Sequence, residues 1–282
     1  MPPEPAPRDR VDLLVVGALT IDRFADGTTA AGGSVLHAAR AAAANGYAVG
    51  AVTVAGPEPE AAIALRELGG LGHIHAERVE RTLRFEHRET AHGRVLILEA
   101  PVVPLACPAR ALLPVAVLHA PVAGEFGAGL AGQQYAAAYR AAILQGWLRA
   151  LEPGHPVDAL PLSAMSDALV SVLSAFNVLV ASSEDLAAVA ADPADQLDAL
   201  RARFGSTPRL VVTDGAAGAW LDDGGSRTRI VPRVTVRAAH TVGAGDAFTA
   251  LITAELARGM ALRPAAEFAT EAVVRLLQSR SS

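Results

Sequence analysis

The segment His240–Phe248 contains two glycines and an aspartate where a strand-like segment runs into an apolar helix. Gly243 and Gly245 let the backbone approach a ligand closely, because neither has a Cβ. The helix that follows directs unpaired N–H groups and its positive dipole end at this turn, which favours an anion. Asp246 would repel that anion, unless it is a base that faces a substrate hydroxyl. This combination predicts phosphoryl transfer, with the phosphoryl group held by the amides of Gly243, Ala244 and Gly245.

The turn Gly243–Asp246 is also compatible with a purely structural role, in which the glycines open a helix and Asp246 caps it. Two further motifs favour the chemical interpretation. Gly32-Gly33 opens an Ala-rich helix near the start of the chain, and Thr213-Asp214-Gly215 follows an apolar, strand-like segment. In this order and spacing, the three motifs resemble those of the ribokinase/PfkB family of small-molecule kinases over residues 12–277.

The resemblance implies an acceptor site that begins near the first strand. Asp22 stands where the family has its sugar-binding aspartate, and a carboxylate there can accept two hydrogen bonds from vicinal hydroxyls. Gly32 and Gly33 correspond to the di-glycine whose backbone approaches the acceptor. His37 departs from the ribokinase pattern, so it is either a specificity residue or a buried histidine of the helix.

Three short segments are similar to those of plant inositol 3-kinases, namely Val122–Glu125, Gln145–Arg149 and Val180–Glu184. This likeness implies that Glu125 and Arg149 bind the acceptor and that Ser182 contacts the nucleotide. It also implies that Glu184 organises Mg²⁺ through water, since Mg²⁺ retains most of its hydration shell. From the residues alone, Glu184 can equally complement a helix N-terminus. Arg149 can either neutralise a phosphate or pair with Glu152.

The resemblance also implies a nucleotide site. Thr213, Gly215 and Gly218 match the family's Thr-x-Gly-x-x-Gly turn, in which the threonine hydroxyl and the glycine amides contact the triphosphate. Taken alone, Gly-Ala-Ala-Gly predicts only a tight turn. The implied ligands are ATP and Mg²⁺, together with a small polyol as the acceptor.

Composition excludes several other classes of protein. The formal net charge of −5 argues against a nucleic-acid partner, and no apolar run has the length of a membrane span. The single cysteine, Cys107, excludes an internal disulfide, and a cytoplasmic location is the default expectation. All 24 basic residues are arginines. The absence of lysine excludes a Walker A loop, a protein-kinase ATP site and Schiff-base chemistry.

Alternation of strand-like and helical segments predicts a three-layer α/β fold, a doubly wound and mostly parallel sheet within a single domain over residues 11–282. Residues 1–10 are expected to form a disordered tail. The pattern extends to a helix through Ala131–Tyr139, and a strand-rich segment, Arg229–Val236, leads toward the Gly-Ala-Gly-Asp motif.

Alternating apolar and polar residues interrupt this pattern at about residues 73–100 and predict a small β lid, to which residues 23–31 are a candidate addition. One face of the hairpin has Leu83, Phe85, Val95 and Ile97, which is more apolar surface than a two-stranded flap leaves bare. A homodimer through the lid is therefore expected.

Two departures from the family pattern bear on nucleotide use. His240 stands where the family has an aspartate that helps bind a monovalent cation, and only Gln278–Ser282 follow the last helical segment. Two functions are therefore weighed. The first is an ATP-dependent kinase that transfers the γ-phosphoryl group to a hydroxyl of a small cyclitol, sugar or nucleoside. The second is a non-catalytic binding or regulatory protein that keeps the fold without productive nucleotide use.

Overall fold

The computed structural model describes residues 9–90, 93–106, 112–132, 139–236 and 241–280. Its central sheet consists of β1 (Asp9–Val16), β4 (Val49–Ala55), β5 (Gly72–Arg78), β8 (Leu112–His119), β9 (Tyr139–Ile143), β12 (Val178–Ser182), β13 (Arg209–Thr213), β14 (Ala219–Asp223) and β15 (Ser226–Ile230). The order is β15-β14-β13-β12-β9-β8-β1-β4-β5, and all neighbours pair in parallel except β13-β14 and β14-β15. The predicted, mostly parallel sheet is confirmed.

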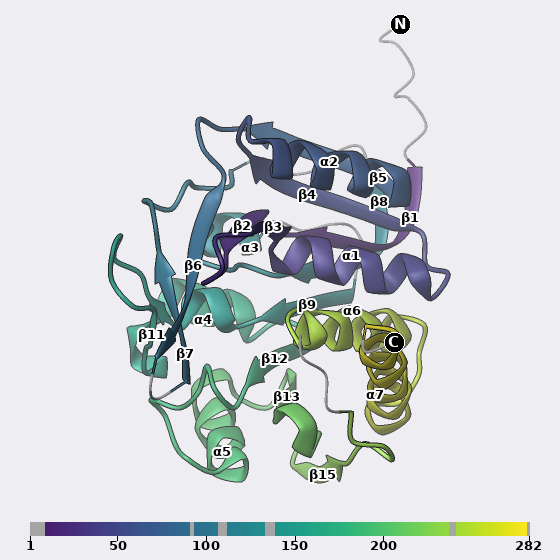
Figure 1. Cartoon of the computed structure of the whole chain (residues 1–282). Helices are drawn as coiled ribbons and strands as arrows, with labels where there is room; N and C mark the ends of the chain where they lie inside the picture. Colours follow the sequence, from purple (N-terminus) through teal and green to yellow (C-terminus); the bar gives the residue numbers. More distant parts are fainter. Residues whose placement is uncertain (1–8, 91–92, 107–111, 133–138, 237–240, 281–282) are drawn as a thin grey trace, which may run out of the picture.

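Helices cover both faces of this sheet (Figure 1). One face packs against α1 (Ser34–Ala44), α2 (Pro59–Leu71), α6 (Ala244–Ala257) and α7 (Leu262–Ser279), and the other against α3 (Ala128–Ala131), α4 (Asp167–Leu173) and α5 (Pro193–Phe204). Strand β1 shows why both layers form: Leu13 and Val15 face the first core, and Leu14 and Val16 face the second. Such a strand, apolar on both sides, is typical of a buried parallel sheet.

The helix starts differ in a way that matters for the site. Helices α4 and α5 begin with ordinary side-chain caps, since Ser166 accepts from Leu169 N–H and Asp192 accepts from Ala194 N–H. Helix α6 has no side-chain cap, and its N-cap Gly243 is in the left-handed region at φ 80°. The start of α6 therefore has N–H groups available to a ligand.

A second sheet lies at one end of the central sheet and consists of β2 (Thr20–Arg23), β3 (Thr29–Gly32), β6 (Leu83–Thr90) and β7 (Gly93–Leu98), in the order β3-β2-β6-β7. We call it the small sheet. The lid boundary at residue 73 was wrong, because β5 pairs with β4 in the central sheet. A half-buried edge strand and a hairpin share the same two-residue periodicity, so the pattern could not separate them.

The apolar side chains that suggested a homodimer are covered within the chain. Leu83, Phe85 and Ile97 are buried, and β7 is flanked by the segment 154–157. On the outer face, Arg23 forms ion pairs with Glu86 at 3.1 Å and with Glu99 at 2.5 Å. These residues therefore no longer give a reason to expect a homodimer through this sheet.

Three further expectations differ from the structure. Asp9 and Arg10 pair with β8 and belong to β1, while residues 1–8 of the expected tail lie outside the described residues. Tyr139 begins β9 rather than ending a helix, and residues 133–138 lie outside the described part. Strand β15 ends at Ile230, so 231–236 is a loop. In the described ranges, no helix combines the length and apolarity needed to cross a membrane.

Stability should depend on pH through His119, which ends β8 and is fully buried between Phe126 and Phe176. Burial lowers the pKa of this imidazole from 6.5 to about 4. Between these values only the unfolded chain binds the proton, so stability is lost as the pH falls from 6.5 toward 4, by about 3 kcal/mol in full.

Urea unfolding of the wild-type protein at pH 7.5 and pH 5 would measure this loss. His119→Leu, a non-titrating residue of similar size, should unfold with a much smaller difference between the two pH values. An unchanged difference in the variant would assign the acid sensitivity to other groups.

Candidate functional site

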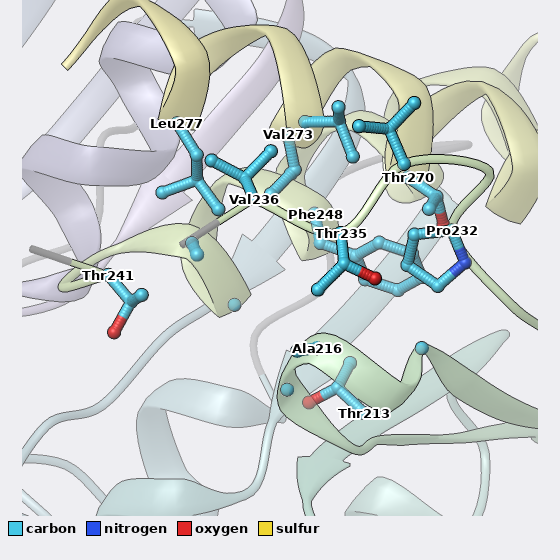
Figure 2. A pocket seen from close by; sticks show the side chains of 16 residues that line it. Thr213, Ala216, Pro232, Thr235, Val236, Thr241, Phe248, Thr270, Val273 and Leu277 are labelled. Carbon is cyan, nitrogen blue, oxygen red and sulfur yellow. The ribbon is translucent and has the colours of Figure 1, made fainter. Parts of the chain in front are cut away.

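The carboxyl ends of β9, β12 and β13 and the starts of α1 and α6 surround a cavity of about 580 Å³, which the small sheet covers on one side. We call it the larger cavity. A second, apolar pocket of about 280 Å³ adjoins it. Figure 2 shows this pocket with Val273 and Leu277 of α7 on one wall and Thr213 and Ala216 on the opposite wall. Both cavities share Thr213, Thr241 and Gly245, so they form one continuous cleft.

The turn Gly243–Asp246 lies where the two cavities meet. Gly243 cannot be replaced without strain, because its φ is positive and a Cβ would overlap the ring of His37. The amides of Gly245 and Asp246 have no hydrogen-bond partner within the described residues, and Asp246 lines the larger cavity. The amide of Ala244, which was expected to hold the phosphoryl group, is engaged within the protein. Its N–H donates to Thr241 C=O at 3.1 Å, and Ala244 lines the apolar pocket.

Asp22, which was matched to the family's sugar-binding aspartate, lines the larger cavity. It is buried on β2, and its Oδ1 lies 3.6 Å from Nε2 of His87. Gly32 stands behind it on β3, where a Cβ would overlap the carboxylate, and Gly33 lines the cavity with φ 97°. The two glycines therefore make room for the Asp22 carboxylate and for the close start of α1.

His37 fits both of the roles left open for it. It is largely buried on α1, yet its ring lines the larger cavity beneath Gly243. Burial lowers the pKa of His37, although the nearby charge of Asp246 opposes this effect. The lowered pKa favours a neutral imidazole, which packs against Gly243 in the turn Gly243–Asp246.

Arg149 is the single arginine among the described residues that line the larger cavity. It pairs with Asp185 at 3.8 Å, and not with Glu152, and it donates to Val122 C=O at 3.1 Å. Gln145 presents its side-chain amide to the same guanidinium. Burial lowers the pKa of Arg149, and the charges of Asp185 and Asp246 oppose that shift. These contacts hold a positive charge at the wall of the cavity.

Two of the residues implied by the resemblance, Glu125 and Ser182, have hydrogen-bond partners within the protein. The carboxylate of Glu125 is buried away from the cavity and accepts from the N–H groups of Ala18 at 2.8 Å and Ala123 at 2.9 Å. Burial raises the pKa of Glu125, and these backbone donors oppose the shift. Ser182 does line the cavity, but its hydroxyl donates to Asp185 at 2.6 Å. Glu125 therefore fixes loops, and Ser182 positions the partner of Arg149.

The turn after β13 borders the apolar pocket. Gly215 and Gly218 line this pocket, and Thr213 lines both cavities. Asp214 N–H donates to Gly218 C=O at 2.7 Å and closes the turn, in which Gly218 has φ 104°. The three residues matched to the nucleotide turn are thus brought to one wall of the cleft.

A metal ion would find few ligands from the protein itself. The described residues contain no group of three or more His, Cys, Asp or Glu side chains that could hold one. Glu184 is exposed and lines the larger cavity, so its carboxylate is available to a hydrated Mg²⁺ ion. This donor set fits Mg²⁺, which is commonly bound through one carboxylate, waters and substrate phosphates. His240 and Cys107 lie outside the described residues.

Sequence reasoning missed several residues that line the larger cavity, namely His87, Gln145, Asp158 and Asp185. A signal existed for His87, which follows Phe85 by two residues on β6 and therefore shares its face of the small sheet. Asp158 comes from a loop-rich region, and Asp185 comes from the turn after β12. In such segments no periodic pattern predicts which way a side chain points.

Comparisons with known proteins place the chain in a family. No curated protein matches it by sequence. A solved pyrophosphate-dependent kinase of the ribokinase family, bound to a pyrophosphate analog and myo-inositol, is 20% identical with a TM-score of 0.74 over 92% of each chain. The Arabidopsis thaliana ribokinase bound to ribose and ATP is 17% identical, with a TM-score of 0.72 over 94% of this chain and 92% of that one.

The nucleoside kinase of Methanocaldococcus jannaschii is 13% identical, with a TM-score of 0.71 over 96% of this chain and 93% of that one. At these identities the likeness shows a shared fold. The model of the pfkB family carbohydrate kinases matches residues 138–281, which is half of the chain. The chain therefore belongs to the pfkB family of carbohydrate kinases.

Proposed function

We propose that the protein transfers the γ-phosphoryl group of ATP to a hydroxyl of a small polyol, such as a cyclitol, a sugar or a nucleoside. One observation carries this proposal. The apolar pocket and the polar larger cavity meet at Gly245, and Asp246 lies on the polar side of that junction. A donor that fills the first cavity would therefore present its terminal phosphate to an acceptor in the second.

In the proposed reaction, the acceptor hydroxyl gives its proton to the Asp246 carboxylate as its oxygen attacks the γ-phosphorus. The bond from that phosphorus to the β,γ-bridging oxygen breaks, and ADP leaves with the electron pair. The free amides of Gly245 and Asp246 face the charge on the transferred group. Magnesium, when bound near Glu184, would neutralise charge on the phosphates.

The apolar pocket supports a nucleotide as the donor rather than pyrophosphate. Its walls include Pro232, Val236, Phe248, Val273 and Leu277, which suit the flat, apolar faces of an adenine ring. Pyrophosphate has no group that would fill such a pocket. One structural neighbour uses pyrophosphate and another was solved with ATP, so the fold alone does not select the donor.

The larger cavity supports a polyhydroxylated acceptor. Asp22, Asp158 and Gln145 offer hydrogen-bonding groups around it, and Phe85 and Ile143 supply apolar contacts. Two of the structural neighbours were solved with a polyhydroxylated molecule bound, one with myo-inositol and the other with ribose. The small sheet would act as a lid that excludes water, which otherwise competes as an acceptor. The non-catalytic alternative is not favoured, because Asp246 and the unpaired amides beside it are retained.

Val234 gives a direct test of the donor. It lines the apolar pocket but is 51% exposed, so Val234→Glu should fold normally and place a charge against the adenine position. We expect the KM for ATP to rise by about tenfold or more, since a carboxylate there loses apolar contact and repels the phosphates. The measurement is initial rates with ATP and with pyrophosphate, over a panel of polyols.

Val231→Glu is the matched control, because Val231 is 60% exposed and does not line the pocket. It should behave as the wild-type protein. A wild-type enzyme that uses pyrophosphate and ignores ATP would contradict the donor assignment, and one that phosphorylates none of the polyols would contradict the proposed function.

A further inference from the structure

His87 is a buried histidine of the small sheet with its ring at the larger cavity. It is 8% exposed, and its imidazole stacks on Phe24 with the ring centroids 5.0 Å apart. Within the described residues, neither ring nitrogen has a hydrogen-bond partner. Its Nε2 lies 3.6 Å from Oδ1 of Asp22, and both residues line the cavity. Buried polar atoms are nearly always hydrogen-bonded in folded proteins, so this pair points to a ligand.

The chemistry of the pair restricts what that ligand group can be. The carboxylate of Asp22 can only accept, while an imidazole N–H at Nε2 can donate. The 3.6 Å separation is longer than a direct N–H···O hydrogen bond between the two residues. A hydroxyl placed beside both can donate to Asp22 and accept from His87 at the same time. An ether or carbonyl oxygen can only accept, an ammonium group can only donate, and a methylene does neither.

We propose that His87 is a specificity-determining residue that, together with Asp22, recognises one free hydroxyl of the acceptor. This inference rests on the proposed function. Its site is formed by β2 and β6, which pair in parallel with Asp22 opposite Phe85, so Asp22 and His87 lie on the same face of the small sheet. The hydroxyl of Thr20 donates to the same Oδ1 of Asp22 at 3.4 Å and helps to hold the carboxylate in place. The stack on Phe24 holds the plane of the His87 ring.

The competing explanation is that His87 is a packing residue of the small sheet. His87→Phe separates the two, because phenylalanine keeps a flat ring against Phe24 and removes both nitrogens. A packing residue would tolerate this change without any effect on the choice of acceptor. If His87 recognises a hydroxyl, the His87→Phe variant loses the preference for a free hydroxyl at one position of the acceptor and keeps it at the other positions.

The experiment measures kcat/KM for the best polyol acceptor and for its set of monodeoxy and mono-O-methyl derivatives. We expect the wild-type protein to reject both derivatives at one position by about 100-fold or more, as sites built to hydrogen-bond a hydroxyl do. In His87→Phe this discrimination should fall at least about tenfold at that position, with the KM of the donor unchanged. His75→Phe is the control, because His75 is exposed on β5, the edge strand of the central sheet, and does not line the cavity.

Unchanged discrimination in a folded His87→Phe would overturn the inference. Calorimetric binding of the same derivatives distinguishes failure of this inference from failure of the proposed function. Binding without turnover would reject the proposed function, while the affinities would still test His87. A wild-type protein that binds none of these polyols would overturn both.

Discussion

Asp246→Asn should lower kcat by roughly two to four orders of magnitude, which is the usual contribution of a positioned general base. Asparagine has the shape of aspartate but cannot take up the proton of the acceptor hydroxyl at neutral pH. The side chain lies in the first turn of α6, where its backbone is fixed by the helix. The fold and the binding of both ligands should therefore remain, and single-turnover rates with calorimetric affinities would show this separation.

Asp158→Asn is the matched control for this variant. Asp158 is a second carboxylate of the same cavity, but it lies on β11 (Asp158–Ala159) and not on the turn Gly243–Asp246. Its loss should change the KM of the acceptor and leave kcat within a few-fold, because it contacts no reacting atom in the proposed mechanism. Near-normal turnover of Asp246→Asn would remove this carboxylate from the mechanism.

Gly245→Val should abolish productive binding of the donor while acceptor binding remains. A Cβ built on Gly245 meets no atom within 4 Å, so the added side chain would enter the open space between the two cavities. That space is where the transferred phosphoryl group is proposed to lie. Displacing the phosphate from the amides of the turn should cost about 100-fold or more in turnover, comparable to the loss of an oxyanion-hole donor.

A substitution of the nearby Gly243 is expected to have a different effect and serves as a comparison. Gly243→Ala forces a side chain into the left-handed region and against His37, so it should lower the melting temperature. Gly245→Val should melt as the wild-type protein does and lose its stabilisation by ATP. Unaltered calorimetric affinity of Gly245→Val for ATP would contradict the proposed phosphate site.

The sequence was most informative where backbone geometry decides the structure. Only a residue without a Cβ fits at Gly32, Gly33 and Gly243, so those positions indicated close approach before the fold was known. The strands of the parallel sheet were equally clear, because strands buried on both faces are apolar throughout, as Val49–Ala55 is.

Side-chain partners could not be predicted in the same way. Glu125 accepts from Ala18, which is 107 positions distant in the chain, and no local pattern reveals such a contact. The pairing of Arg149 with Asp185 rather than Glu152 likewise depends on how two strand ends meet. Strand β5 shows the same limit for the backbone, because the alternation of apolar and polar residues along it does not predict which strand it pairs with.

Helix α1 joins the part of the larger cavity near Asp22 to the turn Gly243–Asp246, where that cavity meets the apolar pocket. Its N-cap Gly33 lines the larger cavity near Asp22, and one turn later His37 fills the space beneath Gly243. Gly33 and His37 lie in the same tightly packed first turn, so we expect a displacement near Asp22 to reach the turn at Gly243. We therefore expect the occupancies of the two cavities to be thermodynamically linked. Whatever factor the acceptor applies to the affinity of the donor, the donor must apply to the affinity of the acceptor.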